Sequence, residues 1–131
     1  DAAQVALLIK QLTQNIVAPK LLEKRIGQLP KQKNSQFLVA LAGNKVVGFG
    51  GLAWYTIPSK GLIGWVEEVV VDEAFRRQGI GRAFVNEVLG LAKRKNISQV
   101  KLTSVADAKD LYEKLGFVKK DQDYLYKNLI L

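Results

Sequence analysis

The stretch Val66–Phe84, which reads VEEVVVDEAFRRQGIGRAF, decides how this chain folds. Its apolar run Val69–Val71 predicts a buried strand, and the glycine-spaced basic segment Arg76–Gly81 predicts a turn that opens a helix. Glycines let the backbone approach a ligand with its N–H groups pointing inward. The helix N-terminus adds unpaired N–H groups and roughly half a positive charge. Strand, turn and helix in this order therefore predict an anion cradle for a phosphate or pyrophosphate.

Two common phosphate-binding motifs do not fit this turn. A Walker-type loop ends in Gly-Lys-Ser/Thr, which is absent, and a dinucleotide-binding fingerprint needs a third glycine where this chain has Phe84. The remaining pattern is Arg76-x-x-Gly79-x-Gly81 after an apolar strand. A second block, AKDLYEKLGF at Ala108–Phe117, follows it. Together the two blocks resemble the GNAT superfamily, the acyl-CoA-dependent N-acetyltransferases, and the first resembles that family's pyrophosphate-binding motif.

Hydrophobic periodicity and turn residues predict the other elements. Two amphipathic helices come first and three strands follow as an antiparallel meander. A helix then leads to a strand parallel to the third one, and a short helix and a hairpin end the chain. The predicted ranges are helices 1–12 and 19–29, strands Gln36–Ala42, Lys45–Ile57 and Leu62–Val71, helix 81–95, strand Ile97–Ser104, helix Ala106–Leu115, and hairpin strands Phe117–Lys120 and Tyr124–Leu131.

This order of elements resembles the GNAT fold over essentially the whole chain. The resemblance implies an α+β protein with three α/β/α layers around a central mixed, mostly antiparallel sheet. The family usually opens with a strand before the first helix, and no such strand is evident after Asp1. Because the chain contains no methionine, we expect that strand to lie upstream or to come from another chain segment. The exposed sheet edge would also allow a homodimer.

Composition limits the chemistry that the chain can perform. Its 131 residues, 48% of them hydrophobic, predict one globular domain over residues 1–131. It has no cysteine and no histidine, which excludes a thiolate nucleophile and disulfides, and we expect no metal. No apolar window approaches the ~20 residues of a membrane span, and no signal peptide is evident. We therefore expect no membrane partner and a cytoplasmic location.

The net charge of +8 has two interpretations. An excess of lysine and arginine favours nucleic acid, but it also suits a polyanionic carrier such as coenzyme A. The lysines are scattered, and the one tight basic run, Lys93–Lys95, ends a predicted helix, where cations suit the helix dipole. We do not expect nucleic acid as a partner.

The resemblance implies where an acyl carrier would bind. In the family, the acyl-CoA arm lies between two central parallel strands that splay apart, so the backbone of Val69, Val70 and Val71 would face the arm's amides. The glycine turn would hold the pyrophosphate. The residues expected to contact acetyl-CoA are thus the three valines and Arg76, Arg77, Gln78, Gly79, Ile80, Gly81, Arg82 and Ala83.

Acetyl transfer to an amine needs a base, a polarised carbonyl and an acid for the thiolate. Without histidine or cysteine, carboxylate, tyrosine and water must move the protons. The acidic pair Glu67 and Glu68 precedes the valines, and neighbouring strand residues face opposite sides unless a bulge intervenes. We slightly favour Glu68 over Glu67 as the base, acting through a water, with the other binding the substrate's ammonium. The resemblance places Tyr112 near the CoA sulfur as the acid.

The sequence therefore predicts an N-acetyltransferase that transfers an acetyl group from acetyl-CoA to a primary amine of a small molecule or peptide. An alternative is a non-catalytic acyl-CoA sensor, which would keep the cradle and lack a working base. Trp54, Tyr55 and Trp65 lie around the expected acceptor side. They either line a substrate pocket or simply pack.

Overall fold

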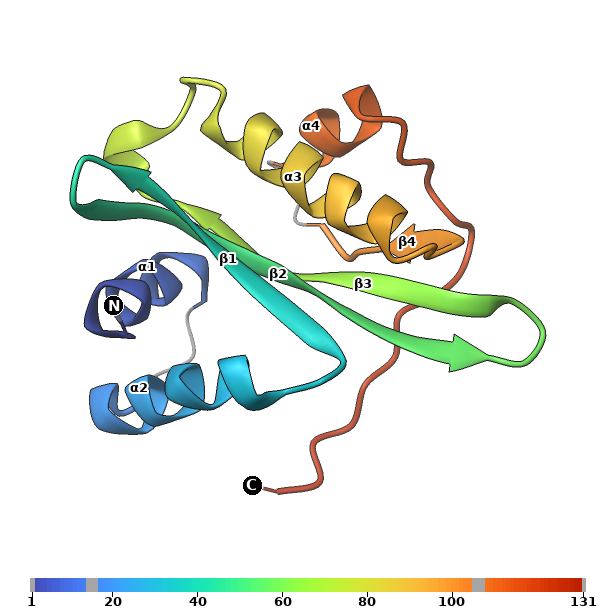
Figure 1. The fold of residues 1–131 in the computed structure, drawn as a ribbon, viewed down its shortest axis with the longest axis horizontal. Coiled ribbons are helices and arrows are strands. Elements are labelled where there is room, and N and C mark those ends of the chain that lie inside the picture. Colours follow the sequence, from blue (N-terminus) through green and yellow to red (C-terminus); the bar gives the residue numbers. More distant parts are fainter. Residues whose placement is uncertain (1, 14–16, 105–107, 131) are drawn as a thin grey trace.

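The computed structural model describes residues 2–13, 17–104 and 108–130. A four-stranded sheet in the order β1-β2-β3-β4 has α1 and α2 on one face and α3, with α4 beside it, on the other (Figure 1). This arrangement confirms the predicted layers. The elements are α1 (Ala2–Leu12), α2 (Pro19–Gln28), η1 (Leu29–Lys31), β1 (Ser35–Ala42), β2 (Lys45–Ile57), β3 (Gly61–Val71), η2 (Glu73–Phe75), α3 (Ile80–Arg94), β4 (Gln99–Lys101) and α4 (Lys109–Lys114).

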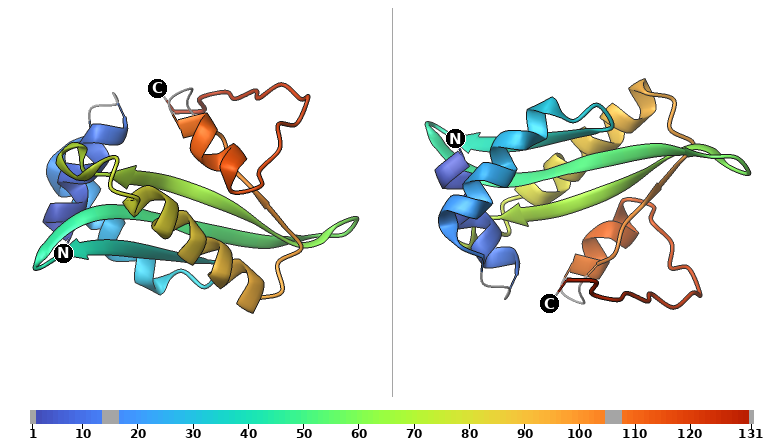
Figure 2. Two further views of the ribbon diagram at one scale, coloured as in Figure 1. Left: turned by 90° about the horizontal axis from the view of Figure 1, so that it is seen from above. Right: turned by 90° about the horizontal axis from the view of Figure 1, so that it is seen from below.

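The sheet has the predicted mixed topology. Strands β1, β2 and β3 form an antiparallel meander, and β4 joins β3 in parallel after the helix α3. The first hairpin turns at Gly43, whose φ of 61° lies in the left-handed region that glycine adopts without strain. The strong twist of the strands is visible in the two rotated views of Figure 2. The meander thus places the centre of β3 between both helical layers.

Each face of the sheet buries its own apolar cluster. On one face, Val5, Leu8 and Ile9 of α1 pack with β2 and β3. On the other, the α3 residues Phe84 and Val88 pack against the sheet. The apolar residues at helical spacing therefore form the faces through which α1 and α3 pack on the sheet. Among the most deeply buried side chains are Val47, Leu52, Ile63, Val85 and Val88.

A β-bulge interrupts the pairing of β2 with β3. Phe49 pairs with Val70 and Gly51 pairs with Glu67, so Gly50 alone opposes two residues of β3. One of those two, Glu68, has a φ of 52°. A side chain on Gly50 would place its Cβ 2.8 Å from Val69 Cγ2. Gly50 therefore allows both the bulge and the close approach of the two strands.

The bulge also sets which way the side chains of β3 point. Val66 and Val69 both pack with the α3-side cluster, although they are three residues apart. Val70 packs with the α1-side cluster. In an unbroken strand, residues two apart share a face. The extra residue shifts this alternation by one position.

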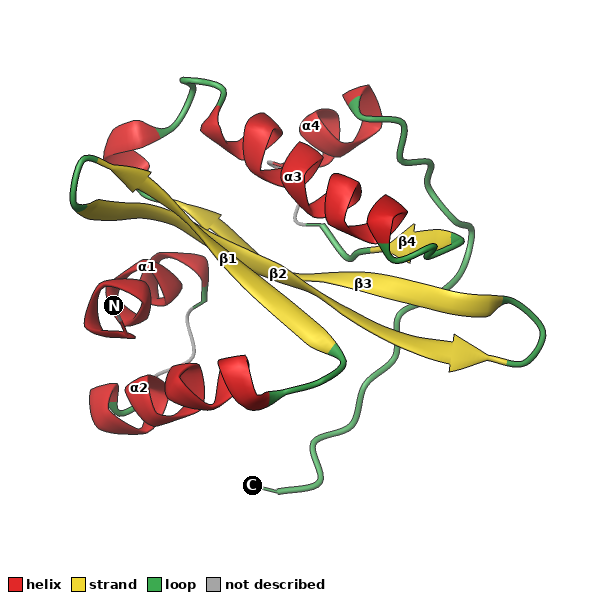
Figure 3. Cartoon of the chain, viewed as in Figure 1, coloured by secondary structure: helices red, strands yellow, loops and turns green. Residues whose placement is uncertain are grey.

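Three predicted elements differ from the structure. Helix α2 ends at Gln28, and Pro30 lies in the short helix η1 that follows. Of the strand expected at Ile97–Ser104, only Gln99–Lys101 pairs with β3. The expected closing hairpin does not form, because the three-residue strand β4 offers little edge for it. Residues 117–130 instead run as a loop (Figure 3). Four residues of the predicted elements lie outside the described residues: the expected N-cap Asp1, Ala106, Asp107 and Leu131.

The loop after α4 leaves large apolar side chains in water. Its exposed residues have relative accessibilities between 71% and 92%, and they are Val118, Tyr124, Leu125, Tyr126, Leu129 and Ile130. We refer to them as the apolar tail. Apolar side chains so fully exposed are uncommon in folded domains.

We predict that Gly51→Ala destabilises the protein by about 1–3 kcal/mol, because an added Cβ overpacks a filled core. That atom would lie 2.5 Å from Phe37 Cδ2 and 2.7 Å from the carbonyl oxygen of Gln36. The matched control is Gly27→Ala in α2, whose Cβ would meet nothing within 4 Å. The control should gain about 0.5–1 kcal/mol. Urea unfolding of the two variants measures both changes, and equal midpoints would contradict the packing around Gly51.

Candidate active site

Strands β3 and β4 separate at the middle of the sheet. Their parallel pairing covers only Ile63–Trp65 against Gln99–Lys101, while β3 continues to Val71. In the described part of the chain, no strand pairs with Val69–Val71 on the β4 side. Apart from the Val71 carbonyl oxygen, which accepts a hydrogen bond from Arg76 Nε, the outward-facing backbone groups of this edge have no partner among the described strands and can bind an extended ligand that carries amides.

Asp72 organises the turn that follows β3. Its Oδ1 accepts a hydrogen bond of 3.1 Å from the N–H of Ala74, and its Oδ2 lies 3.4 Å from Lys45 Nζ. The Ala74 N–H is the main reason that the pKa of Asp72 is lowered, and contacts with Lys45 and Gln11 add to it. The carboxylate therefore fixes the start of the turn.

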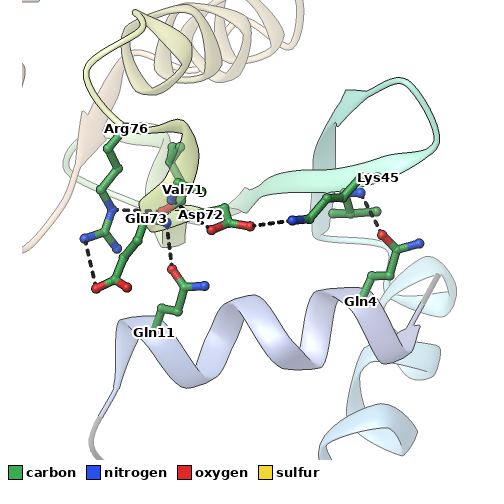
Figure 4. Close-up of polar contacts among 9 residues, drawn as sticks. Gln4, Gln11, Lys45, Val71, Asp72, Glu73 and Arg76 are labelled. Carbon is green, nitrogen blue, oxygen red and sulfur yellow. Dashed lines mark hydrogen bonds and ion pairs between the residues drawn. The ribbon is translucent and has the colours of Figure 1, made fainter.

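Helix α1 is tied to the same turn and to β2. The N–H of Glu73 donates to Gln11 Oε1 at 2.9 Å, and the N–H of Val46 donates to Gln4 Oε1 at 2.8 Å (Figure 4). Nothing in the sequence pattern marked either glutamine. The Asp72 cap could have been found, since an aspartate before a short helical turn is a common N-cap.

The two arginines before the glycines differ in their contacts and in their backbone conformation. Arg76 Nε donates to the carbonyl oxygen of Val71 at 3.0 Å, and its Nη1 lies 4.0 Å from Glu73 (Figure 4). Its guanidinium thus sits at the end of β3, beside the open edge. Arg77 is exposed and has a φ of 65°, a left-handed conformation that is uncommon for residues other than glycine.

The N-terminus of α3 has the geometry expected of an anion cradle. Gly79 adopts a φ of 82° directly before the helix, and the first N–H bonded along the helix is that of Ala83, which donates to Gly79 at 3.0 Å. The N–H groups of Ile80, Gly81 and Arg82 find no acceptor among the described residues. Three amides therefore remain available for an anion, whereas the amide of Ala83 does not.

Gly81 lies close to α4 and to the end of β3. A Cβ there would lie 3.6 Å from Leu111 Cδ2 and 3.8 Å from Val71 Cγ2, which are ordinary contacts. The helix α4 thus reaches the cradle and the end of β3. Gln78 and Arg82 are exposed at the same turn. The structure brings together β3, the glycine turn and the second predicted block.

One of two cavities borders the start of α3, and the other lies on the α1 side of the sheet. One, of about 240 Å³, is lined by Ile80 and Ala83 of α3 and by the middle of β1. Both side chains therefore contribute to that cavity. The other, of about 480 Å³, lies between α1, α2 and β1. Neither cavity is lined by the acidic pair or by Tyr112.

The two glutamates occupy different environments. Glu67 pairs with Gly51, where an added Cβ would strike the Phe37 ring, so Glu67 lies on the α1 side of the sheet. Partial burial, and secondly the charge of Glu68, raise the pKa of Glu67. Both glutamates are solvent-exposed, and Glu68 is the bulge residue with positive φ. The bulge thus separates two carboxylates that are adjacent in the chain.

Tyr112 is half-buried on α4. Its ring meets Phe117 edge to face, with centroids 5.7 Å apart, and its burial raises the pKa of the phenol. It therefore stays protonated at neutral pH. The contact with Phe117 also gives the Tyr112 ring a packing role.

Aromatic and basic side chains gather beyond the acidic pair. Trp65 Nε1 donates to the hydroxyl of Tyr55 at 3.1 Å, and Lys101 Nζ lies 5.7 Å from the Trp65 ring centroid. Trp54 packs with the α3-side cluster, and Lys95 Nζ lies 4.4 Å from its ring centroid. Trp54 and Trp65 therefore belong to opposite faces.

Two structural features bear on other classes of site. Among the described residues, no group of three or more acidic side chains is arranged to hold a metal ion. Within those same ranges, none of the helices combines the length and the apolar character needed to cross a bilayer.

Comparison with known proteins relates this chain to acetyltransferases. The sequence pattern of the acetyltransferase (GNAT) domain matches residues 33–119. An uncharacterized N-acetyltransferase of Methanocaldococcus jannaschii is 31% identical over 98 residues, which is 71% of this chain. A glucosamine 6-phosphate N-acetyltransferase of Trypanosoma brucei brucei is 36% identical over 55 residues, which is 42% of this chain. The matched parts are 43% and 37% of those proteins, so this chain spans less than half of either.

Solved structures show the same fold. Glucosamine-6-phosphate N-acetyltransferase from Arabidopsis thaliana superposes with a TM-score of 0.82 at 21% identity, covering 99% of this chain and 95% of that one. A predicted acetyltransferase from Clostridium acetobutylicum, solved with acetyl-CoA, gives a TM-score of 0.77 at 22% identity, covering 98% and 92%. The fold, the glycine turn after β3 and the match over residues 33–119 together establish that this chain belongs to the GNAT acetyltransferase family.

Proposed function

We propose that this chain is an N-acetyltransferase that transfers an acetyl group from acetyl-CoA to a primary amine. The observation that carries the proposal is the open edge of Val69–Val71, which leads into a helix with three unpaired N–H groups. The amides of an extended acyl-CoA arm suit that strand edge. Its diphosphate suits the amides of Ile80, Gly81 and Arg82. Gly79 and Gly81 leave room there, since a Cβ at either would meet no close contact.

Glu67 is the better candidate for the base. Its raised pKa brings it closer to neutral pH, where a general base works best, and burial is the main cause. Both glutamates are solvent-exposed, and Glu68, at the bulge, is suited to attract the ammonium of the acceptor. This assignment reverses the slight preference for Glu68 as the base that was stated from the sequence.

The proposed transfer is direct, since the chain has no cysteine to carry the acetyl group. Glu67, through a water, takes a proton from the acceptor's ammonium. The N–H of Val69 or Val70 polarises the thioester carbonyl. As the amine nitrogen bonds to the carbonyl carbon, the carbon–sulfur bond breaks, and Tyr112 donates its proton to the thiolate. The nitrogen then gives up its second proton, through water, to the phenolate of Tyr112, which restores the phenol, and solvent removes the proton held by Glu67.

The names of the relatives support an amine on a small molecule as the acceptor. Two of them are named as acetyltransferases of glucosamine 6-phosphate, an amino sugar. We carry over the amine and not the sugar, because the sequence match with one relative covers 42% of this chain and the structural match with the other has 21% identity. A peptide amine is the alternative acceptor. The experiment that tests the proposal is release of free thiol from acetyl-CoA in the presence of an amine library, and no release with any amine would favour the acyl-CoA sensor.

We predict that Gly81→Asp weakens CoA binding at least tenfold, because it places a negative charge beside the phosphates. The ordinary contacts of a Cβ at this position should spare the fold. Gly81→Ala is the matched control, since it adds the Cβ without the charge, and it should bind CoA better than the aspartate variant does. Isothermal titration calorimetry measures both affinities. Normal CoA affinity in Gly81→Asp would refute the cradle.

We predict that Glu67→Gln lowers kcat by about a hundredfold or more, the range of a lost general base. Because the pKa of Glu67 is raised, the wild-type rate should fall with decreasing pH at a value above the ordinary glutamate pKa. This fall should be absent in the variant. A raised folded-state pKa contributes stability that is lost as the pH rises through it, so the glutamine variant should be no less stable at neutral pH. Glu68→Gln is the matched control, and equal losses in both variants would contradict the assignment.

We predict that Tyr112→Phe lowers kcat by about a hundredfold, the lower end for a lost general acid. The ring contact with Phe117 remains in the variant, so its thermal unfolding temperature should hardly change. Turnover of acetyl-CoA with the best amine measures the effect. A variant with unchanged kcat would show that Tyr112 serves only for packing.

A further inference from the structure

We infer that Lys60, Lys101, Tyr55 and Trp65 form a subsite for an anionic group, so that the acceptor is a primary amine that also carries a phosphate or a carboxylate. We call these four residues the anion subsite. The inference rests on the proposed function, because Glu67 marks the place of the amine.

The anion subsite lies on the same face of the sheet as Glu67. Along β3, Trp65 and Glu67 are two residues apart on the same side of the bulge, so their side chains share a face. Lys101 is the parallel partner of Trp65 on β4, and Tyr55 binds the Trp65 indole N–H. Lys60 lies in the turn between β2 and β3, and its side chain contacts that of Lys101. The four side chains are therefore contributed by three neighbouring strands and the turn that joins two of them.

Within the part of the chain that the structure describes, the two lysines bring together positive charge that has no ion-pair partner. Contact with the Lys101 side chain, and then repulsion by its charge, lower the pKa of Lys60. The ion pairs within the described residues involve other lysines and Arg76 and reach neither of these two. An anion between the two ammonium groups would relieve their repulsion, as a phosphate or carboxylate does in charge-assisted hydrogen bonds.

The structure holds the subsite in place rather than leaving it on a loose tip. Ser98 Oγ donates to the carbonyl oxygens of Lys60 and Leu62, both at 3.1 Å, and its N–H also donates to Leu62 at 2.9 Å. The β2–β3 hairpin, which projects from the body in Figure 2, is thus anchored to β4. The hydroxyl of Tyr55 accepts the indole bond, which leaves its own proton free for a ligand oxygen.

The spacing defines the substrate class. Trp65 and Glu67 lie about 7 Å apart along β3, and Lys101 lies about 5 Å further across on β4. The amine and the anionic group of the acceptor should therefore be separated by about 7–10 Å. An extended chain advances about 1.2 Å per bond, so roughly six to eight bonds fit. Short amino acids would not span the two ends.

Acetyl transfer to a series of amines tests the anion subsite. The probes are ω-amino carboxylates and ω-aminoalkyl phosphates of increasing length, each with the neutral amine of equal length. The wild type should prefer the anionic amines of matching span, by roughly ten- to a hundredfold in kcat/KM. The phosphate and carboxylate arms show which anion is preferred. Equal kcat/KM for anionic and neutral amines would overturn the inference and leave the proposed function standing.

Variants of the lysines sharpen this test. Lys101→Gln should lose the preference for anionic amines and keep its rate with neutral ones, and Lys101→Glu should turn the preference toward diamines. The matched control is Lys95→Gln, which removes a lysine next to the other tryptophan on the opposite face and should change nothing. An unchanged preference in both Lys101 variants would overturn the inference.

A binding measurement does not depend on turnover. The chain has two tryptophans, so Trp54→Phe leaves Trp65 as the only indole. Its fluorescence should respond to an ω-aminoalkyl phosphate, and Lys101→Gln in this background should bind roughly tenfold more weakly. If no amine is acetylated but this difference appears, the proposed function fails and the subsite stands. Equal affinities would end the inference whatever the enzyme does.

Discussion

The site depends on one mismatch in the sheet, where Glu68 and Val69 together oppose the single residue Gly50. The bulge keeps Val66 and Val69 on the α3 face and leaves Glu67 on the α1 face. It is possible only because Gly50 has no side chain, since a Cβ there would collide with Val69. The place where the acidic pair divides and the place where β3 loses its β4 partner therefore lie within a few residues of each other.

Burial shifts the pKa values of the two proposed proton-transfer groups in the same direction, and the shift suits a different role in each group. It raises the pKa of Glu67 and of Tyr112. A carboxylate with a raised pKa is a stronger base at neutral pH, whereas a phenol with a raised pKa is more fully protonated and remains an acid. In the proposed mechanism, a chain without histidine or cysteine thus supplies both the base and the acid, with the charge of Glu68 adding to the effect of burial on Glu67.

Local patterns predicted most of the fold, and pairing between distant residues explains what they missed. The amphipathic helices, the meander and the glycine turn follow from periodicity and turn chemistry, and β2 has the predicted bounds. The length of β4 and the loop at residues 117–130 could not be predicted, because a strand ends where its partner diverges. Likewise, nothing near Gln11 in the sequence indicates that it binds the turn at Glu73. The opposite orientation of the Glu67 and Glu68 side chains could be predicted from strand alternation. The position of the bulge could not, because it depends on Gly50, which lies on another strand.

The apolar tail has a thermal consequence. Its side chains gain free energy whenever they leave water, against the edge of β4 or against another molecule. This gain weakens on cooling, because apolar hydration near room temperature is an entropic effect. Solutions of the protein should therefore self-associate more on warming than on chilling, the reverse of what hydrogen-bonded contacts between charged surfaces would do.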